Sequence, residues 1–398
     1  MDVGRVLQEP KLRSRKKAPM AAVFCVLAGS AGLALALHAA APTSVTDRMS
    51  TQERVAQPGW WPTKMLTSDK DYVGSEACAK CHAAISASFK KAEMSKALLR
   101  AADSEVLRTH EGTTFDLESY TYKLENTPEG PQFSVSQGSE SAKMPMTWAF
   151  GDGTVGQVYV TDVNGTFYES HFSYYGGTKG FDRTTNQPHR AKSLTSAVGR
   201  GMMPDEARTC FVCHSAGVTA EGLFDNVMPG VTCEACHGPG ADHVAAMKSG
   251  IEGGEALSVN PKRLDRVSQV DFCGACHMTW VDVQLEVVSD GSTVRFPPYR
   301  LMNSRCWEKG DSRITCTGCH DPHQPLVHEA AFYDQKCLGC HVTKDGAGAT
   351  ENHPGKACPQ SDRNCVSCHM PKREYPDTHH AFTDHNIRIV RAGERLLD

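Results

Sequence analysis

Fourteen of the 17 cysteines in this 398-residue chain fall into seven Cys-x-x-Cys pairs, and a histidine follows each pair directly. The seven motifs are Cys78/Cys81–His82, Cys210/Cys213–His214, Cys233/Cys236–His237, Cys273/Cys276–His277, Cys316/Cys319–His320, Cys337/Cys340–His341 and Cys365/Cys368–His369. This spacing is the attachment signature of c-type haem. Two thiols three positions apart on one turn reach the two vinyl groups of one porphyrin, and the adjacent imidazole lies beneath the iron as proximal ligand. The sequence therefore predicts seven covalently bound haem c groups.

Other uses of paired cysteines do not account for the pattern. A redox dithiol, a zinc site or a disulfide framework does not need a histidine at the next position seven times out of seven. Cys306 and Cys358 lie outside the motifs. An oxidising compartment favours a disulfide between them, but nothing in the sequence places the two thiols close together, so their state stays open.

The distal side of each iron needs a second ligand, for which the remaining histidines and the 14 methionines compete. His243 follows His237 by six residues, beyond the sharp turn at Gly238–Gly240, so it reaches a neighbouring haem rather than its own. His323 follows His320 by three residues and repeats this arrangement. We predict that both are distal ligands.

Further distal candidates lie outside these two segments. Met94 follows His82 by 12 residues in the helical stretch Ala84–Leu99, where it is either a thioether ligand or a packing residue. A methionine ligand would raise the potential of that haem relative to bis-histidine neighbours. The other candidates are His110 and His189, which border a predicted β insert, and His379 and His385 near the C-terminus. His380 is the less suitable partner in that last segment, and His171, His328 and His353 are predicted to be structural.

The elements that position these residues are unevenly distributed. Six motifs lie between Cys210 and His369, which leaves too little chain for a separate hydrophobic core around each haem, and only 7% of residues are aromatic. The haems must therefore form the core themselves, close enough for electrons to hop between them. We expect a mostly irregular and α-helical, haem-packed fold with an antiparallel β insert and low regular secondary structure.

The β insert is predicted from segments in which apolar and polar residues alternate. These segments are Tyr120–Leu124, Gln132–Val135, Val155–Val160 and Thr166–Tyr175, separated by turn residues at Pro128–Gly130, Gly151–Gly153 and Asn164–Gly165. A smaller hairpin is predicted over 281–296, with its turn at Asp290–Gly291.

The N-terminus has the order of an export signal. A basic cluster precedes the apolar run Met20–Leu37, and small residues follow at Ala39–Ala41. The apolar run is also long enough to remain as a single membrane anchor, so a cleaved signal peptide and a retained anchor both stay open. Either places the mature protein in the periplasm, soluble or tethered to the cytoplasmic membrane. The expected divisions are 1–41 signal or anchor, 42–72 linker, 73–104 first haem segment, 105–200 β-rich insert and 201–398 six-haem segment packing with the first haem.

Composition excludes several classes of protein. The chain is 40% hydrophobic and 22% charged, which is typical of a globular protein rather than a disordered one. Its net charge is −4, and without a long basic run a nucleic-acid partner is not expected. The acidic surface hints at a basic redox partner.

Several segments together resemble the cytochrome c-554-like multihaem family of exported proteins. They are CHGPGADH, VNPKRL before FCGACH, SRCWEKGDSRITCTGCHDPH, and CVSCHMPK followed by HHAFTDH. The resemblance covers most of residues 73–390, including WAFGDGTVGQVYV and FYESHFSYY in the β insert. It implies a haem-packed periplasmic electron carrier with distal ligands at Met94, His110, His189, His243, His323, His379 and His385. Related cytochromes often have histidine at the position of Met94, and the family does not supply a substrate.

Two functions are consistent with these features. The first is electron transfer between a membrane quinol-linked donor and a periplasmic or outer-membrane acceptor. The second is an oxidoreductase that acts on a small nitrogen or sulfur oxyanion at one five-coordinate haem. The sequence favours the carrier, because it has no Cys-x-x-Cys-Lys variant and enough histidine and methionine to fill every sixth position.

The motif interpretation predicts the mass of the mature protein. Intact mass spectrometry under denaturing conditions should find the polypeptide plus seven haem groups, because thioether bonds survive unfolding. Any other number of covalent haems would contradict the interpretation of the seven motifs.

Overall fold

The computed structural model describes residues 71–217, 227–286, 292–347, 355–391 and 393–394. The predicted signal or anchor at 1–41, nearly all of the 42–72 linker, and His353 lie outside the described residues. Within the described part of the chain, no helix is both long and apolar enough to cross a membrane.

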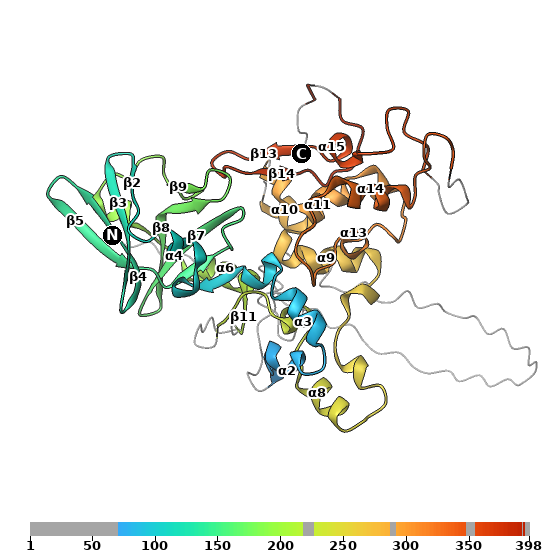
Figure 1. Cartoon of the computed structure of the whole chain (residues 1–398), viewed down its shortest axis with the longest axis horizontal. Helices are drawn as coiled ribbons and strands as arrows, with labels where there is room; N and C mark the ends of the chain where they lie inside the picture. Colours follow the sequence, from blue (N-terminus) through green and yellow to red (C-terminus); the bar gives the residue numbers. More distant parts are fainter. Residues whose placement is uncertain (1–70, 218–226, 287–291, 348–354, 392, 395–398) are drawn as a thin grey trace, which may run out of the picture. The chain divides into compact units, whose positions relative to one another are not determined.

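Two antiparallel sheets form mainly from the chain between the first and second motifs (Figure 1). One sheet has the strand order β2-β3-β4-β5, and the other has the order β1-β6-β7-β8-β10, with β9 paired to β8. The strands of the first sheet are β2 (Thr114–Leu117), β3 (Tyr120–Thr127), β4 (Gly130–Gln137) and β5 (Glu140–Pro145). Those of the second are β1 (Leu98–Arg100), β6 (Trp148–Phe150), β7 (Gly156–Val163), β8 (Thr166–Tyr175), β9 (Gly180–Arg183) and β10 (Gly199–Gly201).

Alternation of side chains explains why these segments form strands. On β3, Tyr120, Tyr122 and Leu124 are buried, while the residues between them are exposed. Successive side chains of a strand point to opposite faces, so this pattern buries one face of the sheet. The turn between β7 and β8 is Asn164–Gly165, with φ of 52° and 81°, as a two-residue hairpin turn requires.

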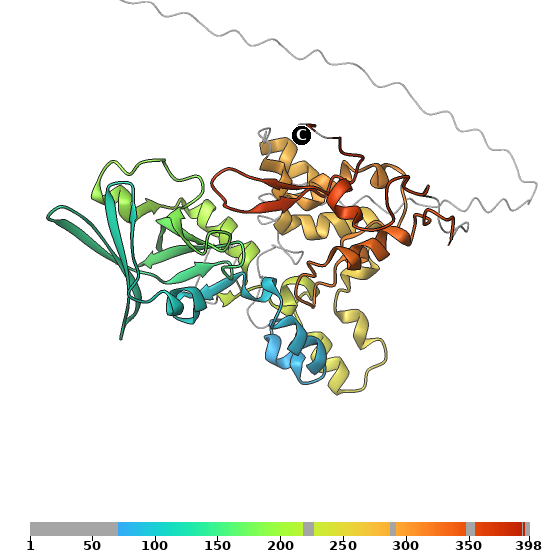
Figure 2. The same ribbon diagram turned by 45° about the horizontal axis from the view of Figure 1, so that its top comes forward.

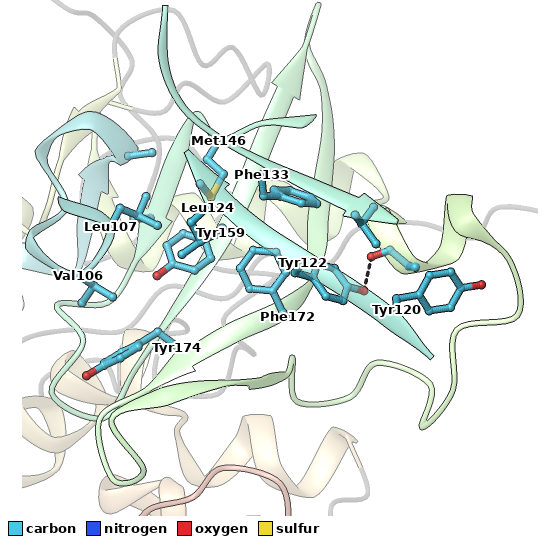
Figure 3. Packing of buried hydrophobic residues seen from close by; sticks show 14 residues of the cluster. Val106, Leu107, Tyr120, Tyr122, Leu124, Phe133, Met146, Tyr159, Phe172 and Tyr174 are labelled. Carbon is cyan, nitrogen blue, oxygen red and sulfur yellow. Dashed lines mark hydrogen bonds between the residues drawn. The ribbon is translucent and has the colours of Figure 1, made fainter. Parts of the chain in front are cut away.

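An aromatic core holds the two sheets together (Figure 3). Phe172 of β8 is fully buried, and its ring meets those of Phe115, Tyr122 and Phe133 edge-on, with centroids 5.0–5.3 Å apart. The Tyr122 hydroxyl donates to the carbonyl of Ala197 at 2.7 Å, the dashed line in Figure 3. The three partner rings come from β2, β3 and β4, so the four-stranded sheet packs on the six-stranded one through aromatic side chains.

Short helices and loops make up most of the chain after residue 227, drawn yellow to red in Figure 2. The α-helices are α2 (Ser75–Ala79), α3 (Ala83–Phe89), α4 (Glu105–Thr109), α5 (Leu194–Val198), α6 (Pro204–His214), α7 (Cys233–His237), α8 (Ala241–Lys248), α9 (Arg266–His277), α10 (Trp280–Glu286), α11 (Pro297–Met302), α12 (Arg305–Glu308), α13 (Cys316–Cys319), α14 (Ala330–Leu338) and α15 (Cys365–His369). Two small hairpins, β11 (Ser215–Ala216) with β12 (Met228–Pro229) and β13 (Lys372–Glu374) with β14 (Ala381–Thr383), lie among them.

Buried apolar side chains are concentrated in the sheet region. Both hydrophobic clusters of the described residues draw on side chains between Leu98 and Val227. Among the described residues after Val227 the buried apolar side chains are few, namely Ala246, Val270, Phe272, Ala275, Val283, Val294, Tyr299 and Leu301. A segment with five motifs and so few buried apolar side chains needs another apolar component, which matches the expectation that porphyrins fill it.

The expected fold class is wrong. The described residues form four antiparallel sheets together with many helices, so the fold is mixed and rich in sheet rather than mostly irregular and helical. The error arose because short strands such as β1, β6 and β10 carry almost no alternation and are completed only by pairing with distant partners. The scarcity of aromatic residues also misled the prediction, since many of those present pack in two buried clusters of the sheet region.

The hairpin predicted over 281–296 is also wrong. Residues 280–286 form helix α10, and 292–295 form the 3-10 helix η7 (Ser292–Arg295). The Thr279 hydroxyl accepts from the backbone N–H of Asp282 at 3.1 Å, and the Asp282 carboxylate accepts from the backbone N–H of Thr279 at 2.9 Å. This reciprocal pair caps the start of a helix, and the sequence signal Thr-x-x-Asp was overlooked.

The aromatic core can be tested at its centre. Phe172→Ala should lower the free energy of unfolding by about 3–5 kcal/mol, because it leaves a cavity among the aromatic rings that surround it. Urea denaturation followed by far-ultraviolet circular dichroism measures the loss. Val163→Ala, which truncates an apolar side chain that is 42% exposed, is the control and should change little. Equal effects of the two substitutions would contradict the assigned core.

Candidate haem-binding sites

Each motif occupies one turn of helix. Helices α6, α7, α9 and α15 end on the motif histidine. In the other three motifs the helix ends earlier, but the histidine backbone N–H still donates to the carbonyl of the first cysteine, at 2.9 Å for His82, His320 and His341. The first cysteine, the second cysteine and the histidine therefore lie within little more than one helical turn. The local backbone therefore suits attachment of one porphyrin at every motif.

Four motif histidines are held through Nδ1 by a backbone carbonyl. The distances are 2.8 Å for His214 to Ala97, 2.7 Å for His237 to Val259, 2.9 Å for His341 to Lys356 and 2.8 Å for His369 to Arg388. Because a carbonyl only accepts, Nδ1 carries the proton and Nε2 keeps its lone pair. Histidines that bind metals generally donate their other N–H in this way. The donor set therefore fits iron at Nε2.

Surroundings also favour the neutral imidazole that binds a metal. Burial lowers the pKa of His214, His237 and His320. Desolvation lowers the pKa of His277 in the same way, and the nearby His214 and His320 add to the effect. A histidine with a lowered pKa is uncharged at neutral pH, so no proton competes for its ligating nitrogen.

Two predicted distal ligands face a motif histidine at a distance that one metal ion would span. The ring centroids of His237 and His323 are 5.9 Å apart, and those of His320 and His385 are 6.2 Å apart. Imidazole nitrogens bind metals at about 2 Å and the ring centre lies about 1 Å further back, so two imidazoles on opposite sides of an ion have centroids about 6 Å apart. The structure thus brings His323 to the third motif and His385 to the fifth.

His385 is further prepared for this position. Its Nδ1 donates to the carbonyl of Thr383 at 3.0 Å, which leaves Nε2 available. Burial lowers its pKa to about 4, with the neighbouring His320 adding to the effect. The imidazole is therefore neutral across the physiological range.

His243 and Met94 lie near the third motif. The Nδ1 of His243 donates to the carbonyl of Gly254 at 2.9 Å. Besides burial, repulsion from His323, His82 and His243 lowers the pKa of His237, so these side chains share one neighbourhood. Met94 is half-buried, and its carbonyl accepts from the N–H of Val231, two residues before Cys233.

Three other candidates lie elsewhere. His110 donates from Nδ1 to the carbonyl of Val106 at 2.8 Å and packs against Tyr174 and Phe181. His379 uses Nε2 in a 2.8 Å contact with Asp182 of β9, and His189 is exposed. Among the described residues, no contact brings these three histidines to a motif. Their ligation stays a prediction.

His328 and His380, which the sequence analysis did not favour as ligands, lie close to each other in the structure. Burial lowers the pKa of His380, and repulsion from Lys372 and His328 lowers it further, so the two histidines are neighbours. His380 is less exposed than the adjacent His379, which was preferred. His171, expected to be structural, is buried near Glu118 in the sheet region.

Polar residues within or beside the motifs connect one motif to another, and sequence reasoning missed them. Glu234, the second residue of the third motif, is 1% exposed and accepts from the backbone N–H groups of Val73, Gly74 and Gly240 at 2.8–2.9 Å. It joins the segment before Cys78 to the third motif. The only signal in the sequence was a carboxylate between two cysteines, and an exposed glutamate at this position would give the same signal.

Similar contacts join the remaining motifs. The carboxamide oxygen of Gln269 accepts from the N–H and hydroxyl of Thr317, which links the fourth motif to the fifth. Asp334 accepts from the N–H groups of Asn364 and Cys365 at 2.7 and 2.8 Å, which links the sixth to the seventh. The fifth and sixth meet through Arg313 and Gly339, and the second and fourth through Cys213 and Ala275.

Together with the His237–His323 pair, these contacts make the seven motifs one connected series. The third motif lies between the first and the fifth. The fifth motif also contacts the fourth and the sixth. The fourth contacts the second, and the sixth contacts the seventh. The order in space therefore differs from the order in sequence.

Cys306 and Cys358 are both free thiols, so the disulfide left open in the sequence is not formed. Burial raises the pKa of Cys306, while hydrogen bonds from the backbone of Ser361 and Gln360 lower that of Cys358. The motif cysteines are partly buried, apart from the exposed Cys81, Cys276 and Cys368.

Comparisons with known proteins agree with the haem assignment. Residues 168–238 match the family model described as cytochrome c554 and c-prime. The chain is 25% identical over 192 residues to the multiheme cytochrome MtrA of Shewanella baltica (strain OS185), covering 43% of this chain and 54% of that protein. It therefore spans about half the length of this curated relative. The outer cell wall cytochrome OcwA aligns over 80% of both chains with 14% identity and a TM-score of 0.47. The match to the family model confirms the resemblance seen in the sequence.

The two histidine pairs lead to a direct test. His323→Ala and His385→Ala should each convert one haem from low-spin to high-spin, because each removes one distal imidazole. Electron paramagnetic resonance of the ferric protein and carbon monoxide binding to the ferrous protein measure the change. His171→Ala, the matched control in the sheet region at a histidine expected to be structural, should leave every haem low-spin. A new high-spin haem in the His171 variant, or none in the other two, would contradict these placements.

Proposed function

We propose that this chain, a multihaem c-type cytochrome that holds haem c covalently, carries electrons along seven haems between a membrane quinol-linked donor and a periplasmic or outer-membrane acceptor. The single observation that supports it most is the set of contacts that connects all seven motifs. Electron transfer along seven haems needs such continuity.

Bound haem c supplies reversible one-electron chemistry, and the protein tunes its potential through axial ligands, burial and hydrogen bonds. The motif cysteines would hold the group, and the motif histidines would bind its iron through Nε2. Carbonyls such as Ala97 O and Val259 O accept from Nδ1, which would increase electron donation by the imidazole. Because these carbonyls belong to the backbone, they keep the imidazoles in one orientation.

The proposed distal ligands have unequal support. His323 and His385 face motif histidines at suitable distances, and His243 and Met94 lie beside the third motif. His110, His189 and His379 rest on their positions in the sequence and on the family resemblance. His380 and His328 are additional candidates because they lie close to each other.

Export supports the location of this carrier. Haem is attached to Cys-x-x-Cys-His motifs outside the cytoplasmic membrane, and residues 1–41 have the order of a signal peptide or anchor. We propose a periplasmic protein, either soluble or tethered by its N-terminus. The acidic net charge favours basic redox partners and salt-dependent docking.

One observation favours the second function, that of an oxidoreductase. Three of the seven predicted distal ligands lie away from the motifs, so one iron could have an open sixth position. An oxidoreductase that acts on a small nitrogen or sulfur oxyanion needs such a site.

Spin state distinguishes the two functions. The purified ferric protein should show only low-spin haem by electron paramagnetic resonance and visible spectroscopy, and cyanide or hydroxylamine should not shift the spectrum, because every sixth position is filled. The same sample should accept seven electrons reversibly. A stoichiometric high-spin signal that shifts with either ligand would contradict the pure carrier and support the oxidoreductase.

A further inference from the structure

The largest fully buried side chain in the described residues is that of Arg300, on α11. Arg300 is 1% exposed and Asp384, its partner, is 0% exposed. The guanidinium donates from Nε to Oδ1 and from Nη2 to Oδ2, both at 2.9 Å. This parallel two-bond geometry is the strongest form of an arginine–carboxylate pair. The pair joins α11 to a segment 84 residues later in the chain.

Burying two charges is expensive, so such a pair contributes little net stability. Two apolar residues of similar volume would satisfy the packing as well. A retained buried pair instead selects one arrangement of the segments it joins, since neither charge can move without losing its partner. The question is which arrangement Asp384 maintains.

Asp384 directly precedes His385, the residue that faces His320. Its own N–H donates to the carbonyl of Pro371 at 3.1 Å, and its Oδ1 accepts from the N–H of Asn386 at 3.0 Å. The backbone is therefore fixed on both sides of His385. A shift of this segment by about 1 Å would be enough to spoil the placement of a metal ligand.

The same carboxylate also reaches the seventh motif. Oδ2 of Asp384 accepts from Nη1 of Arg388 at 2.7 Å. The carbonyl of Arg388 in turn accepts from Nδ1 of His369 at 2.8 Å. One buried carboxylate is thus connected both to the distal candidate of the fifth motif, His385, and, through Arg388, to the proximal histidine of the seventh, His369.

We propose that Asp384, held by Arg300, is a positioning residue that fixes His385 opposite His320 and, through Arg388, the hydrogen bond to His369. This inference rests on the proposed haem ligation. Asp384 makes the coordination at the fifth motif and the potential at the seventh depend on one group.

Asp384→Asn tests the proposal, because it keeps the shape of the side chain and removes the charge that holds both arginines. Covalent haem, counted by intact mass, should be unchanged. One haem should become high-spin and bind carbon monoxide, as in His385→Ala. A second haem should rise in potential, since the hydrogen bond from Nδ1 of His369 weakens. The double variant Asp384→Asn/His385→Ala should contain no more high-spin haem than His385→Ala alone.

Two further variants separate positioning from folding. Arg300→Lys keeps a buried charge but loses the two-bond geometry, so it should give a partial high-spin signal in a folded protein even where Asp384→Asn is poorly expressed. Glu105→Gln makes the same carboxylate-to-amide change in the exposed pair with Arg108 and should change nothing. Folded Asp384→Asn or Arg300→Lys protein with seven low-spin haems and unchanged potentials would overturn the proposal. A high-spin haem in the unmodified protein would contradict the carrier function instead.

Discussion

The constraint on which the rest of this structure depends is the single helical turn at each motif. Cysteine, cysteine and histidine must be presented together, and the hydrogen bond from the histidine N–H to the first cysteine carbonyl closes that turn even where the helix has ended. Once the backbone is fixed in this way, a carbonyl from elsewhere in the chain can hold Nδ1 and orient the imidazole, as Val259 does for His237. Five of the seven motif turns lie after residue 227, where they form or end the helices α7, α9, α13, α14 and α15.

Attachment alone does not make a series of haems, and buried polar side chains supply the connections between motifs. Glu234, Gln269 and Asp334 each accept backbone hydrogen bonds from a segment that belongs to another motif. Such contacts have fixed directions, unlike apolar packing, so they set the relative positions of motifs in a region with few buried apolar residues. The buried pair of Arg300 and Asp384 extends the same principle from the placement of motifs to the placement of ligands.

The sheet region follows a different logic. Its two sheets have a conventional core of aromatic rings around Phe172, and the strands β3 and β8 that supply much of it lie where alternation in the sequence placed strands. The overall fold class was nonetheless wrong, because β1, β6 and β10 have three residues each and no pattern of their own. They are strands only because a partner lies alongside, and that partner can be about 50 residues away, as for Leu98 and Phe150.

The sequence by itself determined the chemistry of this protein, because thioether attachment and proximal ligation depend on residues within five consecutive positions. It also placed His323 and His385 among the ligand candidates. Only the tertiary structure decided that these two face the third and fifth motifs, that His110 packs among aromatic rings, and that Glu234 and Asp384 are buried connectors. The physical reason is distance along the chain. A distal ligand, a buried carboxylate or a short strand acquires its role from a partner tens of residues away, and no local spacing records that partner.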